Sequence, residues 1–149
     1  MLAEAIDQMN FSYTKRLAQP LAMRMLELDI PEVDGIVPVP LSIHRLRERG
    51  FNQSLLIASV ISKQKGIPLM MDSLIKKRVT PPQTGLSAKE RRKNLKDALE
   101  VRGNVRGLRI LLLDDVMTTG ATVRECAKHL MSAGAKEVIV MALARAGNT

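Results

Sequence analysis

Two adjacent carboxylates stand between an apolar run and a short turn rich in hydroxyl groups. Asp114 and Asp115 follow the apolar run Leu108–Leu113 and precede Thr-Thr-Gly-Ala-Thr at positions 118–122. The apolar run predicts a buried strand, and open α/β sheets bind ligands at the carboxyl ends of their strands. Carboxylates at that place can accept hydrogen bonds from sugar hydroxyls. We therefore predict that Asp114 and Asp115 bind a sugar and take part in chemistry at it.

The residues after the acid pair suit a phosphate group. The N–H groups and the partial positive charge at a helix N-terminus favour an anion, and a helix is expected to begin here. A ribose 5-phosphate would fit, with its phosphate held by Thr118, Thr119, Gly120, Ala121 and Thr122. The structural alternative is a strand that ends in two solvated acids before a threonine-capped helix. The turn has no lysine and the chain has no Gly-x-Gly-x-x-Gly, which disfavours Walker-type nucleotide hydrolysis and a Rossmann dinucleotide site.

The positive charge of the chain is concentrated in one segment. The chain has 23 Lys and Arg against 15 Asp and Glu, a net charge of +8. Lys76–Arg109 holds eleven bases and three acids, so its excess equals that of the whole chain. Such a surface favours a phosphate, a pyrophosphate or nucleic acid, and a solvated face that keeps the protein soluble is the alternative. Because only three residues are aromatic, nucleic acid would be bound through its phosphates rather than by base stacking.

Alternating helix and strand patterns are expected to position these groups. Helices are predicted over Leu2–Leu28, Phe51–Lys65, Ser87–Asn94 (from the capping-box spacing of Ser87 and Glu90), and the residues between Gly120 and Gly134. Strands are predicted over Gly35–Leu41, Leu69–Val79, Ala98–Val101, Leu108–Leu113 and Val138–Ala144, the last two as buried strands. The expected buried helix faces are Phe51, Leu55, Ala58 and Ser62, and Val123, Ala127, Leu130 and Met131. The order strand, helix, strand predicts an α/β fold with three layers, a mainly parallel β-sheet flanked by helices.

The composition predicts one domain over residues 1–149 in a reducing compartment. The length of 149 residues fits a single domain. The longest apolar run, Val138–Ala144, is far shorter than the about 20 residues that span a bilayer, so no membrane insertion is expected. One cysteine, Cys126, and two histidines exclude an internal disulfide and a Cys-rich zinc site, and Cys126 is expected to be buried in a helix. Acids near the N-terminus argue against a secretory signal, and a cytoplasmic location follows.

The segment Ile110–Thr122 resembles the phosphoribosyl-pyrophosphate (PRPP) signature of type I phosphoribosyltransferases. Further motifs resemble the ComF competence family with its GntX-like members: Val37-Pro-Val-Pro-Leu41, Arg45–Gln53, Arg78 to Asn94 and Leu143-Ala-Arg145. The likeness covers about Ile36–Arg145, most of the chain. Members of this family usually begin with a cysteine-rich zinc-binding module, and this sequence shows no such module.

The resemblance implies a role for several parts of the chain. Asp114 and Asp115 would bind the ribose hydroxyls, and Thr118–Thr122 would hold the 5-phosphate. The turn after the first strand would lie where the family's pyrophosphate loop lies, and Arg78–Arg92 would be the mobile loop that closes over substrate. The further substrate-binding residues implied are Val39, Pro40, Arg45, Arg78 and Arg91. Mg²⁺ would arrive with the pyrophosphate of PRPP rather than in a protein cage, and a homodimer is the expected assembly.

Two functions from different classes remain open. The first is an enzyme that transfers phosphoribosyl from PRPP to a nitrogen nucleophile and releases pyrophosphate; its acceptor base cannot be read. The second is a non-catalytic competence protein for DNA uptake, whose basic face binds single-stranded DNA or a protein partner. The acid pair discriminates between them, because carboxylates repel DNA phosphates. The intact signature therefore favours a bound phosphorylated sugar, even without turnover.

Overall fold

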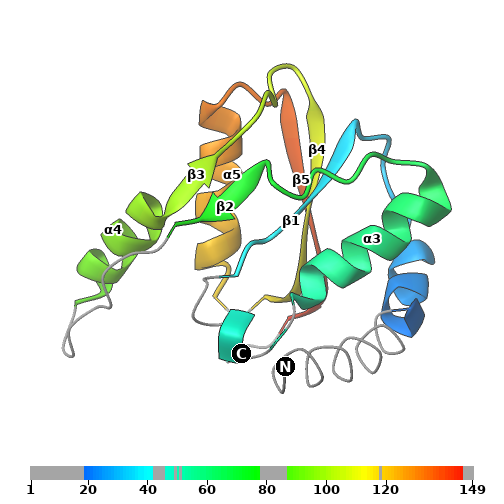
Figure 1. The fold of residues 1–149 in the computed structure, drawn as a ribbon, viewed down its shortest axis with the longest axis horizontal. Helices are drawn as coiled ribbons and strands as arrows, with labels where there is room; N and C mark the ends of the chain where they lie inside the picture. The colour runs from blue at the N-terminus through cyan, green and yellow to red at the C-terminus, as the bar shows by residue number, and fades with distance from the viewer. Residues whose placement is uncertain are drawn as a thin grey trace, which may run out of the picture.

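The computed structural model describes residues 19–41, 46–48, 50, 52–77, 87–117 and 119–145, which form two sheets with helices around them (Figure 1). The elements in chain order are β1 (Gly35–Pro38), α3 (Gln53–Lys65), β2 (Leu74–Lys76), α4 (Ala88–Ala98), β3 (Leu99–Val101), β4 (Arg109–Met117), α5 (Ala121–Ser132) and β5 (Glu137–Arg145). Residues 19–26 and 46–48 are also helical. The first predicted helix, Leu2–Leu28, is therefore described only in its last part, which ends before Ile30-Pro31.

A parallel sheet with the strand order β1-β4-β5 forms the centre of the molecule. Strand β1 pairs with β4 up to Pro38↔Leu113, whereas β5 pairs with β4 up to Met117↔Arg145. The predicted strand Leu108–Leu113 is therefore too short. The acid pair lies within β4 rather than after it, because β5 continues to hold β4 in extended conformation beyond the end of β1.

Helices cover both faces of this sheet, which confirms the three-layer α/β fold (Figure 1). Alternate residues of β4 point to opposite faces, as a strand requires. Ile110 and Leu112 enter the core beside α5 and the β2–β3 ribbon, and Leu111 and Leu113 enter the core beside α3 and residues 19–26. All four side chains are fully buried. The central strand is thus held from both sides up to the residue before the acid pair.

A second, antiparallel sheet of two short strands leads to the basic helix. Strands β2 and β3 pair from Leu74↔Val101 to Lys76↔Leu99. The predicted strand Leu69–Val79 is divided, because Leu69 makes an isolated parallel bridge to Ile36 and the chain turns before β2. Helix α4 begins directly after Ser87 of the predicted capping box and runs beyond the predicted end to Ala98. It projects from the body of the fold (Figure 1).

The buried faces of the two long helices differ from the predicted ones. Helix α3 begins at Gln53 and buries Ser54, Ile57, Ala58 and Ile61. Helix α5 buries Val123, Cys126 and Leu130, whereas Met131 is 48% exposed. The prediction is correct for Ala58, Val123 and Leu130, and Ala127 packs against the core. Both helices carry apolar residues on more than one face, so the pattern alone also placed half-buried or exposed residues, such as Leu55 and Met131, in the buried faces. No helix in the described part of the chain is long and apolar enough to cross a membrane.

Strand β5 forms one edge of the parallel sheet, as far as the described residues show. The side chains of residues 137–144 are half-buried or exposed, and Val140 is 39% exposed. The prediction of a buried strand over Val138–Ala144 is therefore correct about the strand and wrong about its burial. A continuous apolar run does not distinguish a central strand from an edge strand that is covered mainly on one face.

Candidate functional site

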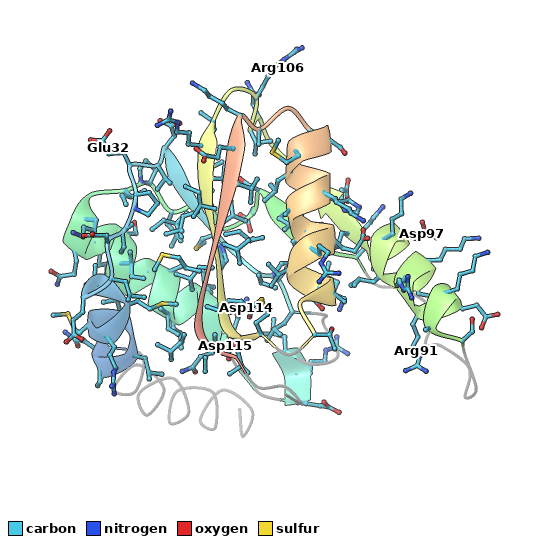
Figure 2. All side chains as sticks on the ribbon, turned by 180° about the vertical axis from the view of Figure 1, so that it is seen from behind. Glu32, Arg91, Asp97, Arg106, Asp114 and Asp115 are labelled. Atoms are coloured by element: carbon cyan, nitrogen blue, oxygen red, sulfur yellow. The ribbon has the colours of Figure 1, made fainter. Side chains whose placement is uncertain are left out.

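The acid pair lies at the carboxyl end of β4, on the part of the strand that β1 no longer covers (Figure 2). Asp114 and Asp115 are half-buried. The backbone N–H of Asp115 donates to Asp114 Oδ1 at 2.9 Å and to Ser54 Oγ at 3.2 Å. The hydroxyl of Ser54 donates to Asp114 Oδ1 at 3.3 Å. The carboxyl group of Asp114 is therefore oriented by its neighbours before any ligand arrives.

The surroundings of Asp114 change its acidity. Burial, reinforced by the adjacent carboxyl group of Asp115, raises the pKa of Asp114 from 3.8 to about 6. The hydrogen bonds from the Asp115 N–H and the Ser54 hydroxyl act in the opposite direction and lower the pKa. A carboxyl group that titrates close to neutral pH beside a second carboxyl group is a feature of functional sites as well as of buried networks.

Gly120 forms the turn between β4 and α5. Its φ of +82° lies in the left-handed region, which glycine adopts more easily than other residues. The N–H of Ala121 donates to Thr119 Oγ1 at 3.3 Å, and within the described residues no side chain caps the helix at Gly120. Thr119 is exposed, whereas Ala121 and Thr122 are half-buried in the first turn of α5. The amino end of α5 thus lies a few residues from the acid pair; Thr118 is outside the described residues.

The turn after β1 is fixed to the same end of the sheet. Val39 is buried, and its N–H donates to the carbonyl oxygen of Leu113 at 2.9 Å. Its own carbonyl oxygen accepts from Asn52 Nδ2 at 3.3 Å. Pro40 follows, half-buried. The structure therefore brings Val39 and Pro40 next to the strand end that carries the acid pair.

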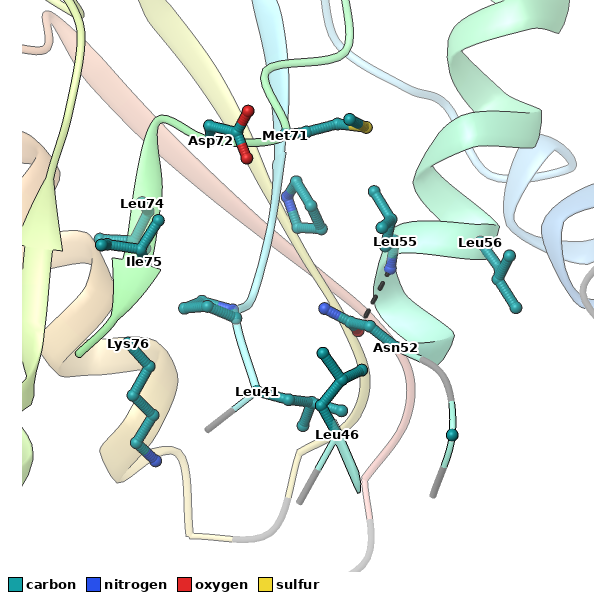
Figure 3. A pocket seen from close by; sticks show the side chains of 13 residues that line it. Leu41, Leu46, Asn52, Leu55, Leu56, Met71, Asp72, Leu74, Ile75 and Lys76 are labelled. Carbon is teal, nitrogen blue, oxygen red and sulfur yellow. Dashed lines mark hydrogen bonds between the residues drawn. The ribbon is translucent and has the colours of Figure 1, made fainter. Parts of the chain in front are cut away.

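An apolar cavity of about 420 Å³ lies beside this turn. Its walls come from the turn after β1, the first part of α3 and the strand β2 (Figure 3). The apolar side chains that line it include Leu41, Leu46, Leu55, Leu56, Met71 and Ile75. Asp114 and Asp115 are not among the lining residues, so the acid pair lies outside this cavity.

Of the predicted basic contacts, Arg91 is the one that the structure describes, and it does not lie at this place. Arg91 is exposed on α4, and Figure 2 shows it well separated from Asp114 and Asp115. Arg45 and Arg78 lie outside the described residues. Among the residues that are described, no group of three or more His, Cys, Asp or Glu side chains could hold a metal ion.

Cys126 is buried inside α5, as predicted. Its side chain is 0% exposed, and burial raises the pKa of the thiol to about 12. A buried, protonated thiol is a packing group rather than a nucleophile.

Sequence reasoning missed Ser54, which touches both members of the acid pair. The signal was present in the helical pattern, because Ser54 stands at the head of the apolar stripe formed by Ile57, Ala58 and Ile61. A serine in a buried stripe needs a hydrogen-bond partner, and the carboxyl group of Asp114 provides one.

Comparisons with known proteins agree on one group of folds. The family model for the phosphoribosyl transferase domain matches residues 36–149. Competence protein F of Haemophilus influenzae is 40% identical over 128 residues, which cover 84% of this chain and 55% of that protein. DNA utilization protein YhgH of Escherichia coli K12 is 36% identical over 154 residues, with 97% of this chain and 67% of that protein covered. This chain therefore spans between about half and two thirds of the length of these relatives.

One solved structure extends the comparison. Glutamine phosphoribosylpyrophosphate amidotransferase from Bacillus subtilis, complexed with ADP and GMP, superposes with a TM-score of 0.58 and 26% identity. The match covers 87% of this chain and 26% of that chain. It therefore concerns one part of a larger enzyme.

Proposed function

The chain belongs to the ComF family of the type I phosphoribosyltransferase superfamily, and on this premise we propose that it binds PRPP, or another phosphorylated ribose, at the end of β4. One observation carries the proposal: the acid pair, the amino end of α5 and the Val39–Pro40 turn all lie at one end of the parallel sheet. The acid pair supplies acceptors for the sugar hydroxyls, and the amino end of α5 supplies donors for a phosphate.

In this proposal the three parts of the site divide the ligand between them. Asp114 and Asp115 accept hydrogen bonds from the ribose hydroxyls. The segment Thr118–Thr122 holds the 5-phosphate, because the first N–H groups of a helix have no partner within the helix and carry partial positive charge. The Val39–Pro40 turn faces the pyrophosphate.

The reaction that we propose is transfer of the phosphoribosyl group to a nitrogen nucleophile. The bond between the ribose C1 and the pyrophosphate oxygen breaks, a C–N bond forms, and pyrophosphate leaves with both electrons of the broken bond. Carboxylates held beside the sugar favour the positive charge that develops on the ribose. The substrate is the magnesium complex of PRPP, in which Mg²⁺ neutralises the pyrophosphate, because Mg²⁺ commonly binds substrate phosphates together with only one or two carboxylates. We place this activity in the cytoplasm.

In this proposal Arg45, Arg78 and Arg91 bind the pyrophosphate in its complex with magnesium. Arg45 and Arg78 follow from the family resemblance. Arg91 stands on α4 apart from the acid pair, so contact with the same ligand requires α4 to approach the end of β4 (Figure 2).

A calorimetric titration of PRPP with and without Mg²⁺ tests the proposal. The wild-type protein is expected to bind magnesium PRPP, and the double variant Asp114→Asn/Asp115→Asn is expected to lose that binding. Asp97→Asn, which removes an exposed carboxylate on α4, serves as the matched control and should bind like wild type. If magnesium PRPP shows no heat of binding with the wild-type protein, the proposal is wrong.

A second function is favoured by one observation, the exposed bases of α4. The basic side chains exposed on this helix are Lys89, Arg91, Arg92, Lys93 and Lys96. In this alternative we propose that they bind single-stranded DNA through its phosphates, or a competence partner with an acidic surface, without catalysis. The homodimer suggested by the resemblance also stays a proposal.

Salt dependence tests DNA binding by α4. The affinity for a fluorescent single-stranded oligonucleotide should fall steeply between 50 and 200 mM salt, by a slope of about −0.7 for each phosphate contact. Arg92→Gln/Lys93→Gln should flatten this slope, whereas Lys63→Gln/Lys65→Gln at the end of α3 should not. A wild-type affinity that does not change with salt would contradict this alternative.

A further inference from the structure

The first turn of α3 contacts both halves of the candidate site. Asn52 precedes the helix and caps it by accepting from the Leu55 N–H at 3.3 Å. The other end of the same amide donates to the carbonyl oxygen of Val39 at 3.3 Å. Two residues later, the Ser54 hydroxyl contacts Asp114. One short segment thus touches the turn after β1 and the end of β4.

Ser54 is the only polar residue in the buried set of the described part of the chain, with 3% exposure. A buried hydroxyl costs free energy unless it is hydrogen-bonded, and here both its donor and an acceptor site are used. It donates to Asp114 Oδ1 at 3.3 Å and accepts from the Asp115 N–H at 3.2 Å. The hydroxyl therefore acts on the side chain of one acid and on the backbone of the other.

These contacts close a ring that begins and ends on β4. The carbonyl oxygen of Leu113 accepts from the Val39 N–H at 2.9 Å, and Val39 accepts in turn from Asn52. Ser54 lies two residues after Asn52 in the chain and makes hydrogen bonds with Asp114 and Asp115. Every link is a hydrogen bond or a covalent segment. The position of the turn after β1 is therefore tied to the position of the acid pair.

We propose that Ser54 is a positioning residue of the site and that, together with Asn52, it sets the distance and orientation between the Val39–Pro40 turn and the acid pair. The inference rests on the proposed function, because it assigns these two parts to the pyrophosphate and the ribose of one ligand. Neither residue touches the reacting atoms. Ser54 acts through Asp114 and Asp115, and Asn52 acts through Val39.

Loss of the Ser54 hydroxyl is expected to change the pKa of Asp114, which also depends on the charged groups around it. Asp115 lies next to Asp114 on β4. The Cys126 thiol of α5 interacts electrostatically with Asp114 and with Lys76 of β2. The Ser54 hydroxyl stabilises the ionised form of Asp114, as its lowering effect on the pKa shows. Without this hydroxyl, Asp114 keeps its proton to higher pH.

The test compares Ser54→Ala with Ser62→Ala, which removes a hydroxyl from the same helix at its other end, where Ser62 bonds to Ile67. Carboxyl ¹³C NMR titration without ligand should place the midpoint of Asp114 higher in Ser54→Ala than in wild type, and leave it unchanged in Ser62→Ala. Magnesium PRPP should bind about tenfold more weakly to Ser54→Ala, which loses both hydrogen bonds to the acid pair, and normally to Ser62→Ala.

A third variant separates the two links. Asn52→Ser retains a capping hydroxyl but loses the amide that reaches Val39. It should leave the Asp114 titration unchanged and still weaken binding of magnesium PRPP. Titration curves for folded Ser54→Ala that match those of Ser62→Ala would overturn the inference. A wild-type protein that binds no PRPP, while Ser54→Ala alone moves the Asp114 midpoint, would overturn the proposed function and support the positioning role.

Discussion

Asp114 and Asp115 are carried by the nine-residue strand β4, which pairs with a strand on each side and has helices over both faces. The bases of α4 are carried by an 11-residue helix next to a ribbon of two three-residue strands. The acids share hydrogen bonds with each other and with Ser54. The bases are exposed, and α4 is joined to α5 through His129 Nε2, which lies 3.0 Å from the carbonyl oxygen of Lys96.

The acid pair on β4 and the bases on α4 suit two different kinds of charged interaction. Groups that must meet the hydroxyls of one small ligand need fixed positions, which a central strand and a buried serine provide. Groups that meet a polyanion act through their number and their exposure, and an exposed helix is sufficient for that purpose. Substitutions near the acid pair should therefore have large effects that depend on one another, whereas substitutions on α4 should have small, local effects.

The largest effect is expected from the strand that supports the acids. Leu112→Ala removes a fully buried side chain two positions before Asp114 and should lower the free energy of unfolding by about 2–5 kcal/mol. Leu95→Ala, at a half-buried position on α4, should cost less than half as much. Urea denaturation of both variants measures the two values. Equal losses would remove the distinction between the rigid strand and the basic helix.

A smaller effect, opposite in sign, is expected from Asp114→Asn. The pKa of Asp114 is raised to about 6 in the folded protein, so the fold favours the protonated carboxyl group. The free energy of unfolding is therefore highest below about pH 4 and falls as the pH rises through 6 and this group ionises. Asparagine stays neutral and avoids this loss. The variant should be more stable than wild type by about 1–2 kcal/mol at pH 7, a value reduced because solvent reaches the half-buried carboxyl group.

Denaturation curves at pH 4 and pH 7 measure that difference. The advantage of Asp114→Asn should be near zero at pH 4 and appear at pH 7. Asp97→Asn on α4 is the control for the change from acid to amide, because this carboxylate is exposed and lies apart from the acid pair. An advantage of Asp114→Asn that is equally large at pH 4 would contradict the account of the acid pair.

The smallest effect is expected at the start of α4. Ser87 and Glu90 form a capping box, with Ser87 N–H donating to Glu90 Oε2 at 2.7 Å and Glu90 N–H donating to Ser87 Oγ at 3.2 Å. Ser87→Ala should destabilise α4 by about 1 kcal/mol. Amide hydrogen exchange should become faster in α4 and stay unchanged in β4. Faster exchange in β4 as well would show that the helix and the acid pair are coupled more closely than their separation suggests.

Much of the fold was predictable because its signals are local. The capping box at Ser87 begins α4, and the α/β order follows from the apolar runs of β4 and β5. What failed depends on neighbours that are distant in sequence. The end of β4 is set by pairing with β5, which no pattern within Leu108–Leu113 reveals. The burial of β5 depends on its place at the edge of the sheet.

The candidate site was predictable to a similar extent. The acid pair and the turn before α5 are contiguous in sequence, so their common location followed from one motif. Val39 and Pro40 were predicted from the family resemblance alone, and the pairing of β1 with β4 brings them to the same strand end. Ser54 belongs to a helix that meets β4 only in the folded protein, and Arg91 stands away from the site because α4 continues outward along the ribbon (Figure 2).

The burial of Cys126 gives the protein an internal reporter of motion. It is the only cysteine in the chain and is 0% exposed between α5 and the sheet, close enough to Asp114 to feel its charge. Thiol reagents attack the thiolate, which a pKa of about 12 makes scarce at neutral pH. Alkylation of the native protein therefore has to wait for α5 to separate from β4. The rate of labelling measures how often the packing around the buried face of α5, behind the acid pair, opens.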